Sequence, residues 1–306
     1  MIVPEIFFAD VFRHARLLYV RSVHIMKEKI YGLFSKCFPQ LSVGKDVFFR
    51  LLDTDSCRVV PCLEDGVLIG CSVVHGNCIR LLCVLPDRRG KGTGSRLLSE
   101  SEQLIAESGF DRAVLGGHDS GLFIGEVVPV KRQGGMSDTF FSRRGYSAEE
   151  ECIEMKMTLG DFDRGKLDIP PCPGGVSFGY IGKEDGDMLR RAVESVDPDW
   201  VQYFTFESPV FAAKLDGRIV GFCIIDENAD TVISTGSNNT GSIGCVGVAP
   251  EMRKKGVGLA MVAEATQSIK QDGCTDAFIH YTYLDKWYGR LGFKTFLRYR
   301  FSEKKL

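Results

Sequence analysis

Two glycine-rich loops have the residue types and spacing that point most directly to chemistry. Three residues after a proline, the first reads Arg89-Gly90-Lys91-Gly92-Thr93-Gly94 and the second Arg253-Lys254-Lys255-Gly256-Val257-Gly258-Leu259. Glycines let the backbone curl so that successive N–H groups point to a common centre. A helix that begins at such a loop adds unpaired amides and a positive dipole end. With the basic side chains, each loop predicts a site for a phosphorylated ligand, most simply a pyrophosphate.

The two loops belong to an internal repeat. Arg253 follows Arg89 by 164 residues (253 − 89), and the glycines of the two loops keep the same offset. One Gly-x-Gly is explained equally well by a tight turn before a helix. Two copies in register, each after an apolar strand and a proline, argue against that simpler explanation.

Composition indicates a globular chain of two ordinary domains. The chain has 306 residues, 44% of them apolar and 25% charged, with a net charge of −2. There is no long basic tract, so charge gives no reason to expect a nucleic-acid or membrane partner. No apolar run approaches the roughly 20 residues of a membrane span.

The eleven cysteines are scattered, often inside apolar strands, and none has Cys-x-x-Cys spacing. A zinc site needs clustered ligands, so no metal is expected. Free, buried thiols in a reducing cytoplasm are the better explanation, and we expect a cytoplasmic protein.

The elements around each loop follow one order. A helical stretch (10–36 or 183–206) precedes a hairpin with an Asp-Gly turn, a strand, the glycine loop, a helix, another strand, and a closing helix and strand. This order predicts an α/β (α+β) fold in which a mixed, mostly antiparallel sheet is flanked by helices. We expect a first half at residues 1–160, a second half at 176–306, and a Pro- and Gly-rich linker at 161–175.

This order together with Arg-x-x-Gly-x-Gly resembles the GNAT superfamily of acetyl-CoA-dependent N-acetyltransferases, in two tandem copies. Residues 287–293, Trp-Tyr-Gly-Arg-Leu-Gly-Phe, look like the family's Tyr-x-x-Leu-Gly-Phe signature, and the first half has Phe140 to Tyr146 at that place. The second half also resembles bacterial two-domain members that acetylate amino sugars.

The resemblance implies that each glycine loop binds the pyrophosphate of acetyl-CoA. It also implies that the pantetheine arm bonds to the main chain of the preceding strand, like an added strand. The Val246 N–H would face the thioester carbonyl, and Gly247 and Val248 the pantetheine; Leu82 and Val84 are the first-half equivalents. The first half would support the second, and is a candidate second CoA site.

The two halves differ where the chemistry is expected. Family members often use the signature tyrosine to protonate the leaving thiolate, which Tyr288 can do and its counterpart Phe141 cannot. Candidates for the base that takes the amine proton are Asp226, Glu227 and Asp285. Each has an ordinary alternative, as a turn residue or, for Asp285, an N-cap, and water could also carry the proton.

The first half carries an insertion. The offset falls from 164 to 147 (288 − 141), so 17 extra residues (164 − 147) lie within 116–138. A long loop of this kind is a lid or a wall of an acceptor site, or a tolerated surface insertion.

The sequence therefore predicts acetyl transfer from acetyl-CoA to a primary amine of a small molecule, with an amino sugar such as glucosamine as one candidate. Two alternatives stay open. One is an acetyl-CoA-binding sensor or scaffold without turnover, and the other is acetylation of a protein or peptide amine.

Overall fold

The computed structural model describes residues 25–39, 41, 43–52, 57–116, 125–130, 139–226 and 239–306. The helices are 25–37, α2 (Lys45–Leu51), α3 (Thr93–Glu107), α4 (Gly186–Glu194), α5 (Val257–Gln271) and α6 (Asp285–Gly289). The strands are β1 (Arg58–Glu64), β2 (Val67–His75), β3 (Cys78–Val84), β4 (Arg112–Leu115), β5 (Glu126–Val128), β6 (Ser147–Thr158), β7 (Ser177–Ile181), β8 (Val210–Leu215), β9 (Arg218–Asp226), β10 (Thr240–Val248), β11 (Asp276–Thr282) and β12 (Lys294–Lys305). Short 3-10 helices are η1 (Pro86–Arg88), η2 (Ser142–Arg144), η3 (Arg164–Lys166), η4 (Lys183–Asp185), η5 (Pro198–Tyr203) and η6 (Pro250–Met252).

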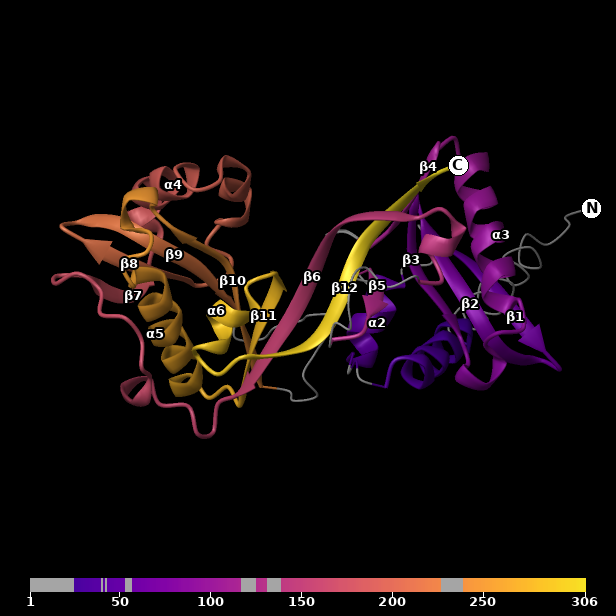
Figure 1. Cartoon of the computed structure of the whole chain (residues 1–306), viewed down its shortest axis with the longest axis horizontal. Helices are drawn as coiled ribbons and strands as arrows, with labels where there is room; N and C mark the ends of the chain where they lie inside the picture. Colours follow the sequence, from indigo (N-terminus) through magenta and orange to yellow (C-terminus); the bar gives the residue numbers. More distant parts are fainter. Residues whose placement is uncertain are drawn as a thin grey trace, which may run out of the picture.

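All twelve of these strands form one continuous sheet. Their order is β1-β2-β3-β4-β12-β6-β11-β10-β9-β8-β7, and β5 pairs with β12 beside this path (Figure 1). The pairs β3/β4 and β10/β11 are parallel and the others are antiparallel. The predicted fold class, a mostly antiparallel mixed sheet flanked by helices, is confirmed.

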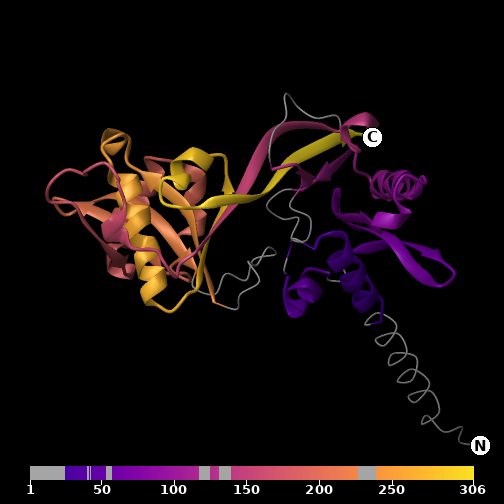
Figure 2. The same ribbon diagram turned by 60° about the horizontal axis from the view of Figure 1, so that its bottom comes forward.

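The two halves exchange their closing strands. The strand β6 ends the first half, yet it lies between β11 and β12; β12 ends the second half, yet it pairs with β4 and β5. These two long strands run together as an arch between the two helix-bearing ends of the molecule (Figures 1 and 2). The division at residue 160 stays a prediction, because the sheet continues across it and each half receives a strand from the other.

The helices that follow the glycine loops pack one apolar face on the sheet, as the repeat predicts. The buried positions of α3 match those of α5 at the shared offset: Leu97, Leu98 and Ile105, against Met261, Val262 and Ile269. Each such side chain contributes roughly 1.5–3 kcal/mol by leaving water. This packing fixes where each helix begins, and hence where its first amides point.

The predicted helix at 183–206 is interrupted. The helix α4 ends at Glu194, and η5 begins at Pro198, whose ring cannot continue a preceding helix. The Asp197 carboxylate accepts a hydrogen bond from the Asp199 N–H at 3.0 Å and caps η5.

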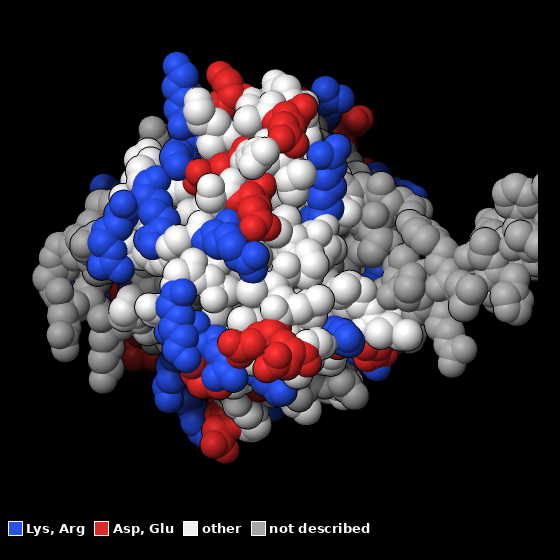
Figure 3. All heavy atoms as spheres, turned by 90° about the vertical axis from the view of Figure 1, so that its right-hand side faces the viewer, with Lys and Arg blue, Asp and Glu red and all other residues white. Residues whose placement is uncertain are grey.

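The predicted linker packs against the second half over part of its length. Leu167, Ile169 and Cys172 are partly buried against the core cluster that includes α5. All eleven cysteines are free thiols, as expected. Among the described helices, none is long and apolar enough to cross a membrane. On the face shown in Figure 3, basic and acidic side chains are interspersed rather than gathered into a patch of one sign.

Candidate functional site

The second-half site begins where two parallel strands separate. The strand β10 pairs with β11 from Thr240 to Ile243 and no further. On its other side, the Ala249 N–H donates to the Val220 carbonyl oxygen at 3.0 Å. Main-chain groups of alternate residues point to opposite edges of a strand. The main-chain groups of Val246 and Val248 therefore point toward the open edge, on the side of β10 that faces away from β9.

A bulge shapes the end of this strand. The register between β9 and β10 shifts between Gly244 and Gly247, and Cys245 has φ +48°. Bulges add twist and turn a strand away from its neighbour. Gly247 is required beside the bulge, because a Cβ there would clash with the ring of Phe222.

The first half repeats this geometry. The strands β3 and β4 pair at Cys78 and Ile79 and then separate. The Leu85 N–H donates to the Ile69 carbonyl oxygen at 2.9 Å, so Leu82 and Val84 direct their main-chain groups to the open edge. Both halves thus present a strand edge that pairs with no neighbouring strand at this point, and an extended ligand can join it through the free main-chain N–H groups.

Each glycine loop delivers an uncapped helix start to that edge. Gly256 (φ +80°) precedes α5, and Gly92 (φ +86°) precedes α3. Neither helix has a side-chain cap at its start. The left-handed loop conformation extends to Lys254 (φ +61°) and its equivalent Gly90 (φ +76°). The first-turn amides are therefore free to bind an external anion.

A cavity of about 570 Å³ joins these features in the second half. Nine of the predicted site residues line it: Val246, Gly247, Val248, Arg253, Lys254, Gly256, Gly258, Leu259 and Tyr288. Lys255 and Val257 do not, and the Val257 side chain is fully buried in the core.

Tyr288 is held at this cavity by α6. Its side chain is 5% exposed and meets Trp287 edge-on at 4.7 Å and Phe293 at 6.1 Å between ring centroids. Among the described residues, the Tyr288 hydroxyl has no hydrogen-bond partner. Burial, and secondarily the Cys223 thiol, raises the pKa of Tyr288 above its ordinary value. The hydroxyl is therefore neutral, and it is available to donate a proton to a ligand in the cavity.

The predicted bases are not gathered at this cavity. Asp226 ends β9 and Asp285 begins α6, and neither lines it. The Asp285 carboxylate accepts a hydrogen bond from the Lys286 N–H at 2.7 Å, the local role that was its alternative. Glu227 lies outside the described residues. No described residue that lines the second-half cavity carries a carboxylate.

The first half has a matching cavity of about 690 Å³. Six of the predicted residues line it: Leu82, Val84, Arg89, Gly90, Gly92 and Gly94. Lys91 and Thr93 do not line it. Phe141 occupies the place of Tyr288, and Arg143 that of Arg290. The described part of the insertion, β5, places Glu126 and Val127 in this wall. No sequence pattern indicates Glu126, because its neighbours do not form a recognisable motif.

The linker covers the second loop but not the first. Pro170 lines the second-half cavity. A Cβ added to Gly256 would lie 2.7 Å from the Pro171 carbonyl oxygen and 2.9 Å from that of Pro170, whereas one added to Gly92 would meet no atom within 4 Å. The two loops therefore have the same backbone conformation, but only the second is packed against the linker.

Comparison with solved structures shows the same fold. A GCN5-related glucosamine N-acetyltransferase region of a fungal multi-domain GH3 β-N-acetylglucosaminidase is 20% identical with a TM-score of 0.66; the match covers 90% of this chain and 36% of that longer one. A GCN5-related N-acetyltransferase from Sphaerobacter thermophilus is 18% identical, with a TM-score of 0.64 and coverage of 90% and 91%. A tandem GNAT protein of clavulanic acid biosynthesis is 16% identical, with a TM-score of 0.51 and coverage of 82% and 83%.

No curated protein sequence matches this chain. The family description "Acetyltransferase (GNAT) family" matches residues 26–121 and 184–293, so each glycine loop falls within one matched region. These two regions cover more than half of the 306 residues. The chain therefore belongs to the GNAT acetyltransferase family and carries its domain twice.

Proposed function

We propose that this protein transfers the acetyl group of acetyl-CoA to a primary amine of a small molecule, and that the second half catalyses the transfer. One observation carries the proposal: Tyr288, the open edge at Val246 and Val248, and the uncapped start of α5 line a single cavity. A cavity that combines a phosphate site, a strand edge and a proton donor suits a thioester of a long phosphorylated cofactor.

Each part of acetyl-CoA has a partner in this arrangement. The first-turn amides of α5, with Arg253 and Lys254, suit the pyrophosphate. The main-chain N–H of Val248, on the open edge of β10, suits the pantetheine arm. In the first half, the equivalent residues of its glycine loop, with Leu82 and Val84, would bind a second CoA.

The transfer needs three contributions from the protein. The amine nitrogen attacks the thioester carbonyl carbon while the Val246 N–H stabilises the charge that develops on the carbonyl oxygen. The carbon–sulfur bond breaks, and Tyr288 donates a proton to the departing thiolate. A base must first remove a proton from the ammonium group; Asp226, Glu227, Asp285 and water are the candidates.

An amino sugar is the first acceptor to test. A cavity of about 570 Å³ is of the size that encloses small ligands. One structurally similar protein is described as a glucosamine N-acetyltransferase region. A concave site of this size favours a small amine over a folded protein as the acceptor.

The test compares Tyr288→Phe with Phe141→Tyr. We expect thiol release from acetyl-CoA, measured with glucosamine and a panel of amines, to fall roughly 10²–10⁴-fold in Tyr288→Phe. Calorimetry should show unchanged acetyl-CoA affinity in both variants, and any gain of turnover in Phe141→Tyr should be much smaller than the loss in Tyr288→Phe. Acetyl-CoA binding without turnover on any amine would instead favour a sensor or scaffold. Turnover on peptides alone would favour a protein acetyltransferase.

A further inference from the structure

The first-half cavity contains a carboxylate that its second-half counterpart lacks. Glu126 is 5% exposed and lines the cavity together with Val84, on the open strand edge, and the loop glycines. It reaches this position because β5 pairs with β12, the strand donated by the second half. The same cavity therefore holds a phosphate-type loop, a ligand-binding edge and a buried acid.

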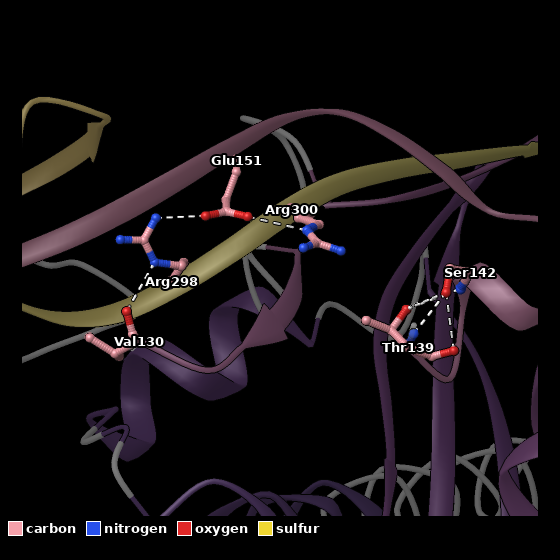
Figure 4. Close-up of polar contacts among 6 residues, drawn as sticks. All are labelled: Val130, Thr139, Ser142, Glu151, Arg298 and Arg300. Carbon is pink, nitrogen blue, oxygen red and sulfur yellow. Dashed lines mark hydrogen bonds and ion pairs between the residues drawn. The ribbon is translucent and has the colours of Figure 1, made fainter. Parts of the chain in front are cut away.

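Within the described chain, the Glu126 carboxylate forms no direct ion pair, although an arginine lies beside it. Arg300 lies directly opposite it in the β5/β12 register. However, the Arg300 Nε atom lies 3.3 Å from Oε2 of Glu151, and an Arg298 guanidinium nitrogen lies 2.6 Å from Oε1 of the same carboxylate (Figure 4). Among the described residues, no hydrogen bond or ion pair ends at the Glu126 carboxylate.

The Glu126 carboxylate oxygens are not among the fully buried side-chain atoms that lack a partner, so the carboxylate faces the cavity rather than the closed interior. Among the described lining residues Glu126 is the one acid, beside Arg89, Arg143 and Arg144. A carboxylate that faces a cavity can bind a positive group of a ligand.

The cavity wall around Glu126 is well fixed. Thr139 and Ser142 bond to each other through both main-chain and side-chain atoms, including the Thr139 N–H to Ser142 Oγ at 2.8 Å (Figure 4). Arg144 stacks on Phe140 at 3.8 Å, and donates to the Phe140 carbonyl oxygen at 2.7 Å and to Ser95 Oγ at 2.6 Å. These contacts tie the turn at 139–144 to the start of α3, so the wall is rigid.

We propose that the Glu126 carboxylate receives the ammonium group of a primary amine and removes a proton from it, which makes the first-half cavity a second acyl-acceptor site. This inference rests on the proposed function, since it requires acetyl-CoA at the first glycine loop. The proton donor and the base would then lie in different cavities. The first cavity has the base and no tyrosine, and the second has the tyrosine and no carboxylate among its described lining residues.

The step balances with acetyl-CoA as co-reactant. One N–H bond of the ammonium breaks and the proton moves to Glu126. The amine nitrogen forms a bond to the carbonyl carbon, and the carbon–sulfur bond breaks with its electron pair leaving on sulfur. The second amine proton goes to the thiolate, which gives the amide and CoA, and Glu126 returns its proton to water.

Two glycines allow each cavity to be closed separately. A Cβ at Gly258 would lie 3.0 Å from Val248 and 3.4 Å from Trp287, and one at Gly94 would lie 3.4 Å from Phe140. Gly258→Phe and Gly94→Phe therefore fill the second-half and first-half cavities respectively. Tyr288→Phe is a second way to disable the second half, because it keeps the packing if Gly258→Phe does not fold.

The experiment measures thiol release from acetyl-CoA with glucosamine and other primary amines. With the second half disabled, we expect residual turnover that Glu126→Gln lowers roughly 10²–10⁴-fold and Glu126→Asp lowers less. Calorimetry should show that Glu126→Gln leaves acetyl-CoA affinity unchanged. Glu207→Gln, a change at an exposed carboxylate away from the first-half cavity, is the matched control and should have no effect.

Residual turnover that is indifferent to Glu126→Gln, or no residual turnover in either disabled background, would overturn the inference. The proposed function fails differently. It would be contradicted by full turnover in Gly258→Phe together with loss of turnover in Gly94→Phe, or by no turnover in the unmodified protein.

Discussion

The Nε atom of Arg253 donates a hydrogen bond to the carbonyl oxygen of Val248 at 3.1 Å, and Arg89 makes the equivalent bond to Val84 at 2.9 Å. Each bond ties a glycine loop to the end of the open strand beside it. The repeated arginine therefore does more than place a positive charge near a phosphate. It fixes the distance between the anion site and the strand edge that a single extended ligand has to span.

Arg253→Lys tests this role, because lysine keeps the charge but lacks the planar fork that allows Nε to bond while the other nitrogens point elsewhere. The bond is exposed, and an ordinary hydrogen bond contributes about 1 kcal/mol. We therefore expect the Kd for acetyl-CoA to rise roughly fivefold, measured by calorimetry in the Gly94→Phe background. Lys255→Ala, outside the cavity, is the control. Equal affinity in Arg253→Lys and the unmodified protein would show that charge alone matters.

The raised pKa of Tyr288 predicts the form of the pH profile. The protonated hydroxyl is the active form, and burial extends its range beyond the ordinary tyrosine pKa of about 10. Loss of the tyrosine proton should therefore produce no falling limb in kcat/KM up to about pH 10. The rising limb should follow deprotonation of the acceptor and shift between two amines of different pKa. A decline that starts near neutral pH, and that disappears in Tyr288→Phe, would contradict this assignment.

The linker contact predicts unequal effects of two equivalent substitutions. Gly92→Ala and Gly256→Ala each place a Cβ in a left-handed conformation, which costs about 1–2 kcal/mol. Gly256→Ala adds a close approach to the Pro171 carbonyl oxygen, and Gly92→Ala meets nothing. We expect Gly256→Ala to lower the free energy of unfolding, measured in urea, by clearly more than Gly92→Ala does. Equal losses would mean that the linker moves away at little cost.

The features that could be predicted from the sequence are the local ones. The hairpins, the glycine loops and the apolar faces of α3 and α5 depend on residues within one or two turns of each other, and the structure reproduces them. The exchange of β6 and β12 could not be predicted, because an alternating strand does not specify which neighbour it pairs with. Glu126 and the Glu151–Arg298 pair become neighbours only through that exchange, so no spacing in the sequence indicates them.

A buried polar cluster on the exchanged strand predicts a large stability effect. Glu154 of β6 is fully buried; the Tyr299 hydroxyl donates to its Oε1 at 2.6 Å, and Nδ1 of His280 lies 2.9 Å from its Oε2. Removing the carboxylate leaves the buried Tyr299 hydroxyl without its acceptor, and a lost hydrogen bond to a charged group costs about 1.5–3 kcal/mol. We expect Glu154→Ala to destabilise the protein by that amount in urea unfolding. The control Glu207→Ala, at an exposed position, should stay within about 0.5 kcal/mol. A small effect at Glu154 would mean that the cluster is not closely coupled to folding.

The strand exchange predicts that neither half is a stable monomer on its own. Without β12, the first half leaves β4 as an open edge and β5 without its partner. Without β6, the second half leaves β11 open. Unpaired edges of this kind associate with whatever strand is available. Fragments 1–160 and 161–306, produced separately, should therefore aggregate or form swapped oligomers. Produced together, they should form a one-to-one complex that is retained through a tag on either fragment and elutes at the size of the intact chain. A fragment that is monomeric by light scattering, with its own cooperative melting transition, would show that its half folds without the donated strand.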